Sequence, residues 1–226
     1  MRIYQNFKEA LSEIKRDLVE MGVRTHPRTY QDKVVEDDPG FDTMEINNYI
    51  YTVTNPKFKD LNPTQPWADE ELLERVSGNS VNPGEAYKKR PKVWEQFLEE
   101  DGRFSYTYSE RLDFHHQVEH IADRIRIDRD SRQLYIAIWN PKDVTFIGKG
   151  VRDPCSLGYY FKMVQGKLDM TYLQRSADFV THLENDIFLS YYIQSYIATA
   201  AEVLIGNYCH WIGSLHIFKK DGKGVF

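Results

Sequence analysis

Residues 153–186 read DPCSLGYYFKMVQGKLDMTYLQRSADFVTHLEND, and this stretch decides the fold. Two of its segments, 157–164 and 167–173, are rich in branched and aromatic residues, which favour strands. A Gln-Gly pair at 165–166 separates them and is typical of a tight turn. We therefore expect a hairpin of two core strands, with a Pro-Cys pair before the first and Gln-Arg-Ser at the end of the second.

Outward from this hairpin, apolar residues recur at helical spacing on both sides. The expected helices are residues 3–21, ended by Gly22, then 68–76, 114–127 and 181–204. Further strands are expected at 132–139, at 214–218 and, within an otherwise irregular segment from 25 to 66, at 49–53. The pattern predicts one α/β domain over residues 1–226, built on a single β-sheet.

The composition is that of an ordinary globular protein, with 28% charged and 41% hydrophobic residues. A formal net charge of -5 gives no general affinity for nucleic acid. No apolar stretch approaches the roughly 20 residues that a membrane span needs, and the N-terminus has no apolar signal-peptide core. We therefore expect a cytoplasmic protein that uses neither a membrane nor nucleic acid as a partner, with Cys155 and Cys209 unpaired.

Cys155 is the first candidate for chemistry, although a lone cysteine is most often a small buried residue. Arg152 lies three residues before it, and the glycine-rich turn 147–151 leads into the same segment. If the cysteine lies at a strand mouth beside arginines, its thiolate is favoured. A thiolate is the species that covalent catalysis needs.

Arg175 and Ser176 form a second candidate, because a planar guanidinium and a hydroxyl can hold neighbouring phosphate oxygens. A solvated strand tip would have the same sequence. Arg24 and Arg132 lie in turn-like segments from which a long side chain could complete a phosphate site, although isolated surface arginines usually contribute nothing.

The histidines raise the question of a metal site, because the pattern at 115–120 could place two imidazoles on one helix face. No cysteine or carboxylate lies at ligand spacing, so no metal site is expected. We interpret these histidines, and His26 and His210 with them, as surface residues, and Cys209 as a buried structural residue.

Taken together, these residues resemble the thymidylate synthase superfamily, in which Pro-Cys opens the catalytic strand, Gln-Arg-Ser-x-Asp closes the next and an arginine turn reads DPDSR. The resemblance covers about residues 20–218 and includes Glu-Leu-Leu at 71–73, Val-Trp at 93–94 and Gly-Ser-Leu-His at 213–216. It implies a thymidylate synthase-like fold, with a mixed β-sheet flanked by helices, and a homodimer formed through the sheet. It also implies a pyrimidine nucleoside monophosphate as substrate and 5,10-methylenetetrahydrofolate as co-substrate.

The resemblance assigns roles residue by residue. Cys155 would attack C6 of the pyrimidine, and Glu71 would be the general base, with Glu70 as an open alternative. The remaining assignments are Tyr108 beside the cysteine, Arg24, Arg175 and Ser176 at the phosphate, Arg132 at the partner subunit's phosphate, Gln174 and His216 at the base and sugar, and Trp94 and Asp178 at the folate.

One position departs from the superfamily in a way that carries chemistry. Thymidylate synthases have an asparagine that pairs with uracil, and counting from Arg175 puts Asp186 there. Cytosine presents an unprotonated N3 and an N4 amino group, which a protonated carboxyl can match, or a carboxylate can face cytosine protonated at N3. Phage-type deoxycytidylate hydroxymethylases carry aspartate at this position. If Asn185 faced the base instead, the substrate would be a uracil nucleotide.

Further departures concern the phosphate, the sugar and the folate. Gln133 replaces a second arginine, Phe218 replaces a tyrosine beside His216, and Ser156 and His182 replace a histidine and a glycine. The sequence ends ten residues after His216, where other members continue into a lid, and a wetter site would favour water over hydride as the final reactant. The expected function is therefore a cytidylate (dCMP or CMP) 5-hydroxymethylase. The alternatives are a cytidylate methylase, a divergent thymidylate synthase acting on dUMP, or a non-catalytic nucleotide-binding relative.

Overall fold

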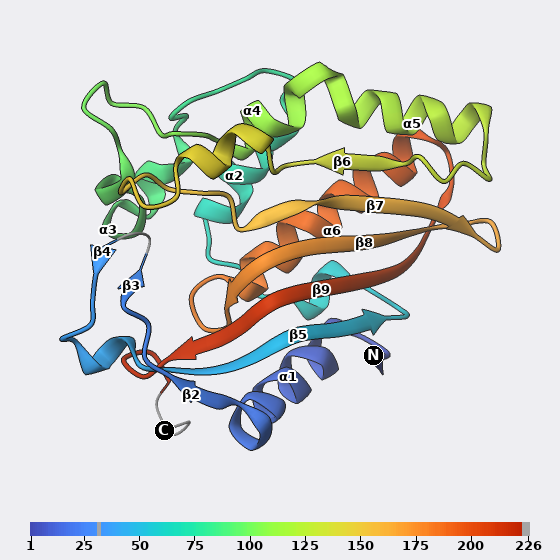
Figure 1. Ribbon diagram of the computed structural model, residues 1–226. Coiled ribbons are helices and arrows are strands. Elements are labelled where there is room, and N and C mark those ends of the chain that lie inside the picture. The colour runs from blue at the N-terminus through green and yellow to red at the C-terminus, as the bar shows by residue number, and fades with distance from the viewer. Residues whose placement is uncertain (31–32, 223–226) are drawn as a thin grey trace.

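A computed structural model describes residues 1–30 and 33–222, and a mixed sheet forms its centre (Figure 1). Within this part of the chain the sheet has seven strands in the order β1-β5-β9-β8-β7-β6, with β2 also paired to β5. Its strands are β1 (Arg2–Tyr4), β2 (Val23–Thr25), β5 (Thr43–Val53), β6 (Tyr135–Ala137), β7 (Ser156–Val164), β8 (Lys167–Asp178) and β9 (Leu204–Phe218). The pairs β1–β5 and β8–β9 are parallel and the others antiparallel, so the expected mixed sheet is confirmed.

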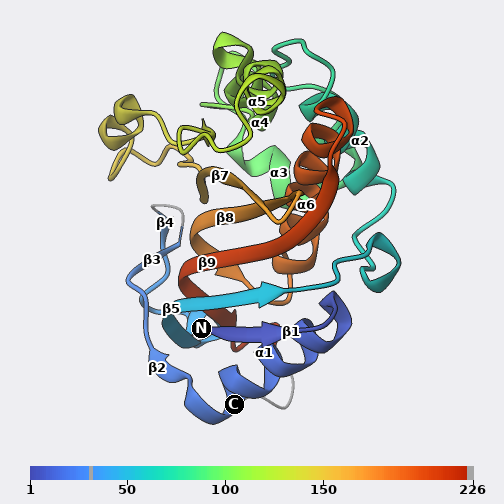
Figure 2. The ribbon, with the colours of Figure 1, turned by 90° about the vertical axis from the view of Figure 1, so that its right-hand side faces the viewer.

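Helices cover one face of this sheet and its two edges. They are α1 (Phe7–Met21), α2 (Trp67–Arg75), α3 (Pro91–Trp94), α4 (Tyr108–Asp113), α5 (Gln117–Ile127) and α6 (Leu183–Ala200). Short 3-10 segments lie at Pro39–Phe41, Phe58–Asp60, Ala86–Lys89, Glu95–Phe97, Phe114–His116 and Pro141–Thr145, and a small ribbon pairs β3 (Thr29–Tyr30) with β4 (Lys33–Val34). Figure 2 shows α6 and α2 on one side of the sheet, while the described residues place no helix over the centre of the other side.

Alternation along β9 shows which face is the core. Tyr208, His210 and Ile212 are fully buried on the side that carries α6. Cys209 and Trp211 point the other way and are partly exposed. The expectation that Cys209 is a buried structural residue, and that His210 lies at the surface, was therefore wrong for both residues.

The hairpin and most helices were predicted correctly, but three elements were not. The strand expected at 214–218 is the 15-residue β9, in which the buried polar residue His210 interrupts the apolar alternation. The strand expected at 49–53 begins six residues earlier, at Thr43. The helix expected at 114–127 begins only at Gln117, because His115 and His116 adopt left-handed backbone angles, with φ of 55° and 50°, and separate α4 from α5.

Candidate active site

One cleft gathers most of the residues that the sequence singled out. It has about 1080 Å³ of empty space, including its open mouth, which is enough for a nucleotide together with part of a second ligand. Among the candidates, it is lined by Glu71, Trp94, Tyr108, Cys155, Ser176, Asp178, Asp186 and His216. These side chains come from α2, α3, α4, the residue before β7, the end of β8, the first turn of α6 and the end of β9.

Arg175 holds the segment that carries Cys155. Its Nε donates to the carbonyl of Pro154 at 2.9 Å, and its backbone N–H donates to the carbonyl of Cys155 at 2.8 Å. Burial raises the pKa of the Cys155 thiol, and the positive charges of Arg175 and Arg152 oppose that shift only in part. The expectation that neighbouring arginines favour the thiolate thus has the correct sign for the arginines, but burial outweighs them.

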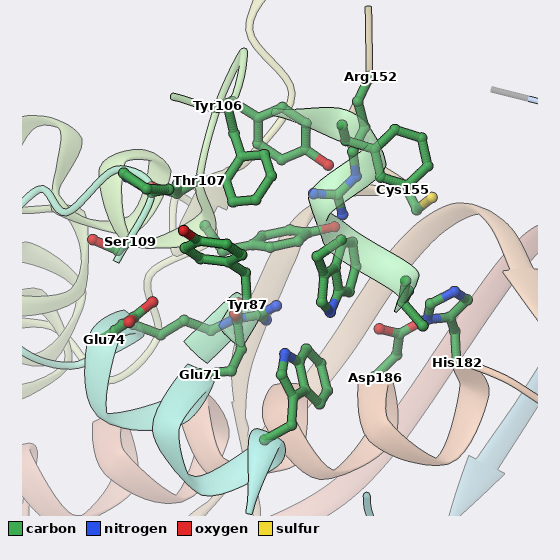
Figure 3. Close-up of a pocket in the computed structure, with 18 of the residues that line it drawn as sticks. Glu71, Glu74, Tyr87, Tyr106, Thr107, Ser109, Arg152, Cys155, His182 and Asp186 are labelled. Atoms are coloured by element: carbon green, nitrogen blue, oxygen red, sulfur yellow. The ribbon is translucent and has the colours of Figure 1, made fainter. Parts of the chain in front are cut away.

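Arg152 and three aromatic side chains form one side of the cleft, which we call the aromatic wall (Trp67, Trp94, Tyr106 and Arg152). The Arg152 guanidinium carbon lies 4.3 Å from the ring centre of Trp94 and 5.0 Å from that of Tyr106, within cation–π range. Trp67 stacks on Trp94 with ring centres 5.9 Å apart. Figure 3 shows Arg152 reaching into the cleft near Tyr106, above Asp186 and His182.

The polar atoms of the aromatic wall lack partners. The indole N–H groups of Trp67 and Trp94 and the hydroxyl of Tyr106 are buried, and none forms a hydrogen bond within residues 1–30 and 33–222. Buried polar atoms are normally satisfied, so these three donors suit a flat ligand that brings its own acceptors.

Glu71 forms an ion pair with Arg75, one helical turn further along α2. Arg75 Nε lies 2.8 Å from Glu71 Oε1, and the Arg75 guanidinium covers the ring of Tyr108 with its carbon 3.9 Å from the ring centre. Both members of the pair line the cleft, as does Glu74, whereas Glu70 does not. The Glu74 carboxylate is already engaged within the protein, because it accepts a hydrogen bond from the backbone N–H of Ala86 at 2.9 Å. This arrangement favours Glu71 as the acid that faces a ligand.

Asp186 lies at the bottom of the cleft in the first turn of α6. Gln174 Nε2 donates to its Oδ2 at 2.7 Å, and burial raises the pKa of its carboxyl to about 6. Charged side chains face it from several elements, namely Arg75 on α2, Arg90 and Arg152 in the loops, and Asp178 on β8. The neighbouring Asn185 is turned away, since its amide accepts from the backbone N–H of Thr64 at 2.7 Å. The cleft therefore contains the aspartate rather than the asparagine.

Ser156, which follows the cysteine, joins two tyrosines beneath it. Its hydroxyl donates to the Tyr108 hydroxyl at 3.2 Å and forms a second hydrogen bond with that of Tyr172. Tyr108 is thereby held beside Cys155 on one side and Arg75 on the other.

The arginines expected at a phosphate are only partly assembled. Arg175 and Ser176 line a hollow next to the cleft, together with Tyr30 and His216. Arg24 is exposed and lines a different hollow with Asp42 and Lys219. Arg132 is exposed just before β6 and lines neither of them, so its assignment to the partner subunit's phosphate stays a prediction.

Several residues of the cleft were missed by the sequence reasoning. The pairing of Glu71 with Arg75 was available from their spacing of four residues on a predicted helix. Tyr30 had no such signal. It reaches the cleft from β3, its ring meets that of Phe218 edge-on at 5.5 Å, and burial raises the pKa of its phenol to about 12. Tyr30 thus supplies a hydroxyl close to Phe218, which has none.

The sequence profile of the family described as "Thymidylate synthase" matches residues 62–225 of this chain, which is most of its length. The chain belongs to the thymidylate synthase family. A protein of Methanothermobacter marburgensis described as "Putative thymidylate synthase" is 29% identical over 198 residues, covering 84% of each chain. One of the same description from Methanocaldococcus jannaschii is 27% identical over 202 residues, covering 85% of this chain and 83% of the relative.

A solved structure shares the fold of this thymidylate synthase family member. The thermostable thymidylate synthase A from Bacillus subtilis superposes with a TM-score of 0.76 at 20% identity, covering 95% of this chain and 80% of that one. Family membership makes the chain a thymidylate synthase-like, folate-dependent one-carbon transferase that binds a pyrimidine nucleoside monophosphate. The unpartnered donors of the aromatic wall fit the methylenetetrahydrofolate that this family uses as co-substrate.

Two kinds of feature are absent from the described residues, a metal site and a membrane-spanning helix. No group of three His, Cys, Asp or Glu side chains in residues 1–30 and 33–222 is arranged to hold a metal ion. No helix in the same ranges combines the length and apolar character that crossing a membrane requires.

Proposed function

We propose that this thymidylate synthase family member is a cytidylate 5-hydroxymethylase, which acts on dCMP or CMP with methylenetetrahydrofolate. The observation that carries the proposal is Asp186, a carboxyl at the bottom of the cleft with a pKa raised to about 6. Near neutral pH such a group can both give and take a proton.

The edges of the two bases favour cytosine at this carboxyl. Cytosine offers the N4 amino group as a donor and N3 as an acceptor that can take a proton. Uracil offers N3–H as a donor and the O4 carbonyl as an acceptor. O4 and an ionised Asp186 are both acceptors, so they would face each other without a proton between them. An uncompensated contact of this kind costs on the order of 3 kcal/mol in a desolvated site.

The proposal assigns a residue to each step of the reaction. Cys155 adds to C6 after its thiol has lost a proton, and Asp186 gives its proton to N3 as the ring accepts the electron pair. Glu71, held by Arg75 at 2.8 Å, takes part in removing the C5 proton, directly or through water. Trp94, which is part of the aromatic wall, and Asp178 would hold the folate, and the bound folate supplies the one-carbon unit that becomes attached to C5.

The hydroxymethyl product is the second part of the proposal. It rests on Asp186, the aspartate that this chain shares with deoxycytidylate hydroxymethylases. In those enzymes water adds to the C5 methylene. Transfer of hydride would instead give a methyl group and dihydrofolate. An assay of dihydrofolate by its absorbance separates the two products, and its formation in step with turnover would contradict hydroxymethylation.

A direct test measures tritium release from C5. The purified protein is incubated with methylenetetrahydrofolate and 5-tritiated dCMP, CMP or dUMP, and we expect release from a cytosine nucleotide at least tenfold faster than from dUMP. Release from dUMP alone would contradict the cytosine assignment. Cys155→Ala should abolish release, and Cys209→Ser is the matched control; a non-catalytic relative would bind nucleotides but release no tritium in either form.

The open face of the sheet supports a homodimer as part of the same proposal. Cys209 and Trp211 on β9 and Leu173 on β8 are partly exposed there, and the described chain covers the centre of that face with no helix. Pairing two such faces would bury apolar surface and bring Arg132 of one subunit toward the other. Sedimentation equilibrium gives the oligomeric state, and Trp211→Glu should shift it toward the monomer.

A further inference from the structure

Behind Asp186, three buried polar side chains form a continuous hydrogen-bonded series into the sheet. Gln174 donates to Asp186 at 2.7 Å, the carbonyl of Gln174 lies 2.9 Å from His210 Nε2, and His210 Nδ1 lies 3.0 Å from the Tyr51 hydroxyl. Gln174 is 1% exposed, and His210 and Tyr51 are fully buried. They come from the adjacent strands β8, β9 and β5, and Tyr51 pairs directly with His210 in the β5–β9 register. We call these three residues the buried relay.

The protonation of His210 fixes the direction of these hydrogen bonds. Burial lowers the pKa of His210 to about 3, so its ring is neutral and carries one N–H. Because the Gln174 amide nitrogen donates to Asp186, its carbonyl faces Nε2, and Nε2 must be the donor. Nδ1 is then the acceptor for the O–H of Tyr51. Every donor of the relay therefore points toward Asp186.

The reverse direction would leave a buried donor unsatisfied. If Gln174 turned its carbonyl toward Asp186, His210 would have to move its proton to Nδ1 and donate it to Tyr51. The Tyr51 hydroxyl has no other hydrogen-bond partner in the part of the chain that the structure describes, so its own proton would lose its acceptor. Packing fixes the ring as well, since His210 stacks on Tyr172 with ring centres 4.5 Å apart and planes 23° apart.

We propose that the buried relay sets base preference, with His210 as a positioning residue that keeps an N–H group of Gln174 aimed at Asp186. The inference rests on the proposed function, in which Asp186 faces the base. It extends that function by assigning a role to His210 and Tyr51, which contact neither substrate nor folate in the proposal. It also moves Gln174, expected at the base, to a place behind Asp186, because Gln174 is 1% exposed and does not line the cleft.

The relay acts on the proton transfer that distinguishes the bases. When the Cys155 thiolate forms its bond to C6, the C5=C6 electron pair moves to C4–C5 and the C4=N3 pair moves to N3. N3 takes the proton as the O–H bond of Asp186 breaks. The resulting carboxylate accepts hydrogen bonds from N3–H, from the N4 amino group and from Gln174. Uracil has no free electron pair at N3 to take that proton in the plane of the base, so the relay stabilises the cytosine reaction alone.

Without the relay, the Gln174 amide is free to turn and present its carbonyl to Asp186. That arrangement favours a protonated Asp186 that donates back to Gln174, so the proton is no longer directed to N3. We expect His210→Phe to lower kcat/KM for cytosine nucleotides about 10- to 30-fold, in keeping with loss of a hydrogen bond to a charged group. Kcat/KM for dUMP should change less than about threefold.

The test compares the dCMP-to-dUMP ratio of kcat/KM, measured by tritium release from C5, in four proteins. They are the wild type, His210→Phe, the milder Tyr51→Phe, which only removes the hydroxyl that sets the histidine tautomer, and Tyr208→Phe as a control. Tyr208 lies on the same strand with its ring 6.0 Å from that of His210, is fully buried, and is hydrogen-bonded to Ser190 rather than to the relay. Thermal unfolding of each variant accompanies the assay.

The expected result is a ratio lowered about tenfold or more by His210→Phe, about threefold to fivefold by Tyr51→Phe and not at all by Tyr208→Phe. Equal losses for both bases, or an unchanged ratio in Tyr51→Phe, would show that these residues only stabilise the fold and would overturn the inference. If His210→Phe does not fold, Tyr51→Phe decides. A wild type that releases tritium only from dUMP overturns the proposed function itself, which separates that failure from failure of the relay.

Discussion

The two sides of the cleft differ in how their polar atoms are satisfied. At the bottom, Asp186 and the buried relay already form their hydrogen bonds inside the protein, at 2.7 to 3.0 Å. In the aromatic wall, the donors of Trp67, Trp94 and Tyr106 are buried and have no partner among the residues described. One side is complete before any ligand arrives, and the other becomes complete only with one.

This difference indicates how the recognition of the two ligands is divided in this thymidylate synthase family member. A preorganised group discriminates between similar ligands, because it cannot adapt to the wrong one without losing hydrogen bonds. A surface of stacked rings and unpaired donors gives affinity to a flat ligand with less discrimination. We therefore expect changes at Asp186 to alter which base reacts, and changes in the aromatic wall to alter how tightly the folate binds.

The largest expected effect is that of Asp186→Asn on base preference. An asparagine cannot give a proton to N3, but its amide can donate to O4 of uracil and accept from N3–H. We expect the dCMP-to-dUMP ratio of kcat/KM to fall by about 10³-fold, which corresponds to about 4 kcal/mol. Tritium release from the two nucleotides measures it. A ratio that stays above one tenth of the wild-type value would show that Asp186 does not select the base.

Trp94→Ala tests the other side of the comparison. The change removes a ring that stacks on Trp67 and carries Arg152, so we expect KM for methylenetetrahydrofolate to rise about 30-fold. The base ratio should stay within about twofold of the wild type, because Asp186 is untouched. Trp139→Ala, at a partly exposed tryptophan beyond β6, is the matched control. A changed base ratio in Trp94→Ala would mean that the two sides do not act separately.

The sequence predicted which residues line this cleft better than it predicted their protonation. Asp186 could be placed by counting from Arg175, since β8 leads into α6 through a short connection whose length fixes the register. The direction of the pKa shift of the Cys155 thiol could not be predicted. It depends on the balance between burial and the charges of two arginines, and that balance is set by distances that a sequence does not contain. Likewise, the length of β9 was underestimated, because His210 is a buried polar residue whose hydrogen-bond partners lie on other strands.

Residues distant in the sequence were the ones missed. Tyr30 enters the cleft from a two-residue strand, more than 120 positions before Cys155, and no local pattern marks it. Arg24 is a different case: the resemblance assigns it to the phosphate, and the structure shows its side chain exposed in a different hollow, so that assignment stays a prediction. Family motifs fix which residues are present, whereas the reach of a flexible side chain depends on the loops around it.

Asp186 should also govern part of the pH dependence of stability. Its pKa is about 6 in the folded protein, against an ordinary value of 3.8, because burial penalises the carboxylate. Between these two values the unfolded chain loses this proton while the folded chain keeps it, so the free energy of unfolding falls as pH rises through that window. The amide of the Asp186→Asn variant does not titrate. The variant should therefore gain stability over the wild type between about pH 4 and pH 6.

The expected gain of Asp186→Asn is about 2 kcal/mol at pH 7, less than the roughly 3 kcal/mol that the two pKa values imply, because one side of Asp186 faces the open cleft. Urea unfolding at several pH values measures it. Glu100→Gln, at an exposed acid outside the cleft, should show no such trend. A stability difference that is the same at pH 4 and pH 7 would show that Asp186 does not titrate in this range.

The smallest expected effect links the aromatic wall to the nucleophile. Arg152 lowers the pKa of Cys155, against the larger effect of burial, so Arg152→Gln should raise that pKa further. In a Cys209→Ser background, the rate of alkylation by iodoacetamide at pH 7.5 should fall about threefold to fivefold, and its pH midpoint should move upward. Arg103→Gln, at an exposed arginine paired with Glu110, should leave the rate unchanged. If Arg152→Gln also leaves the alkylation rate unchanged, Arg152 does not act on the Cys155 thiol, and the cation of the aromatic wall serves the folate alone.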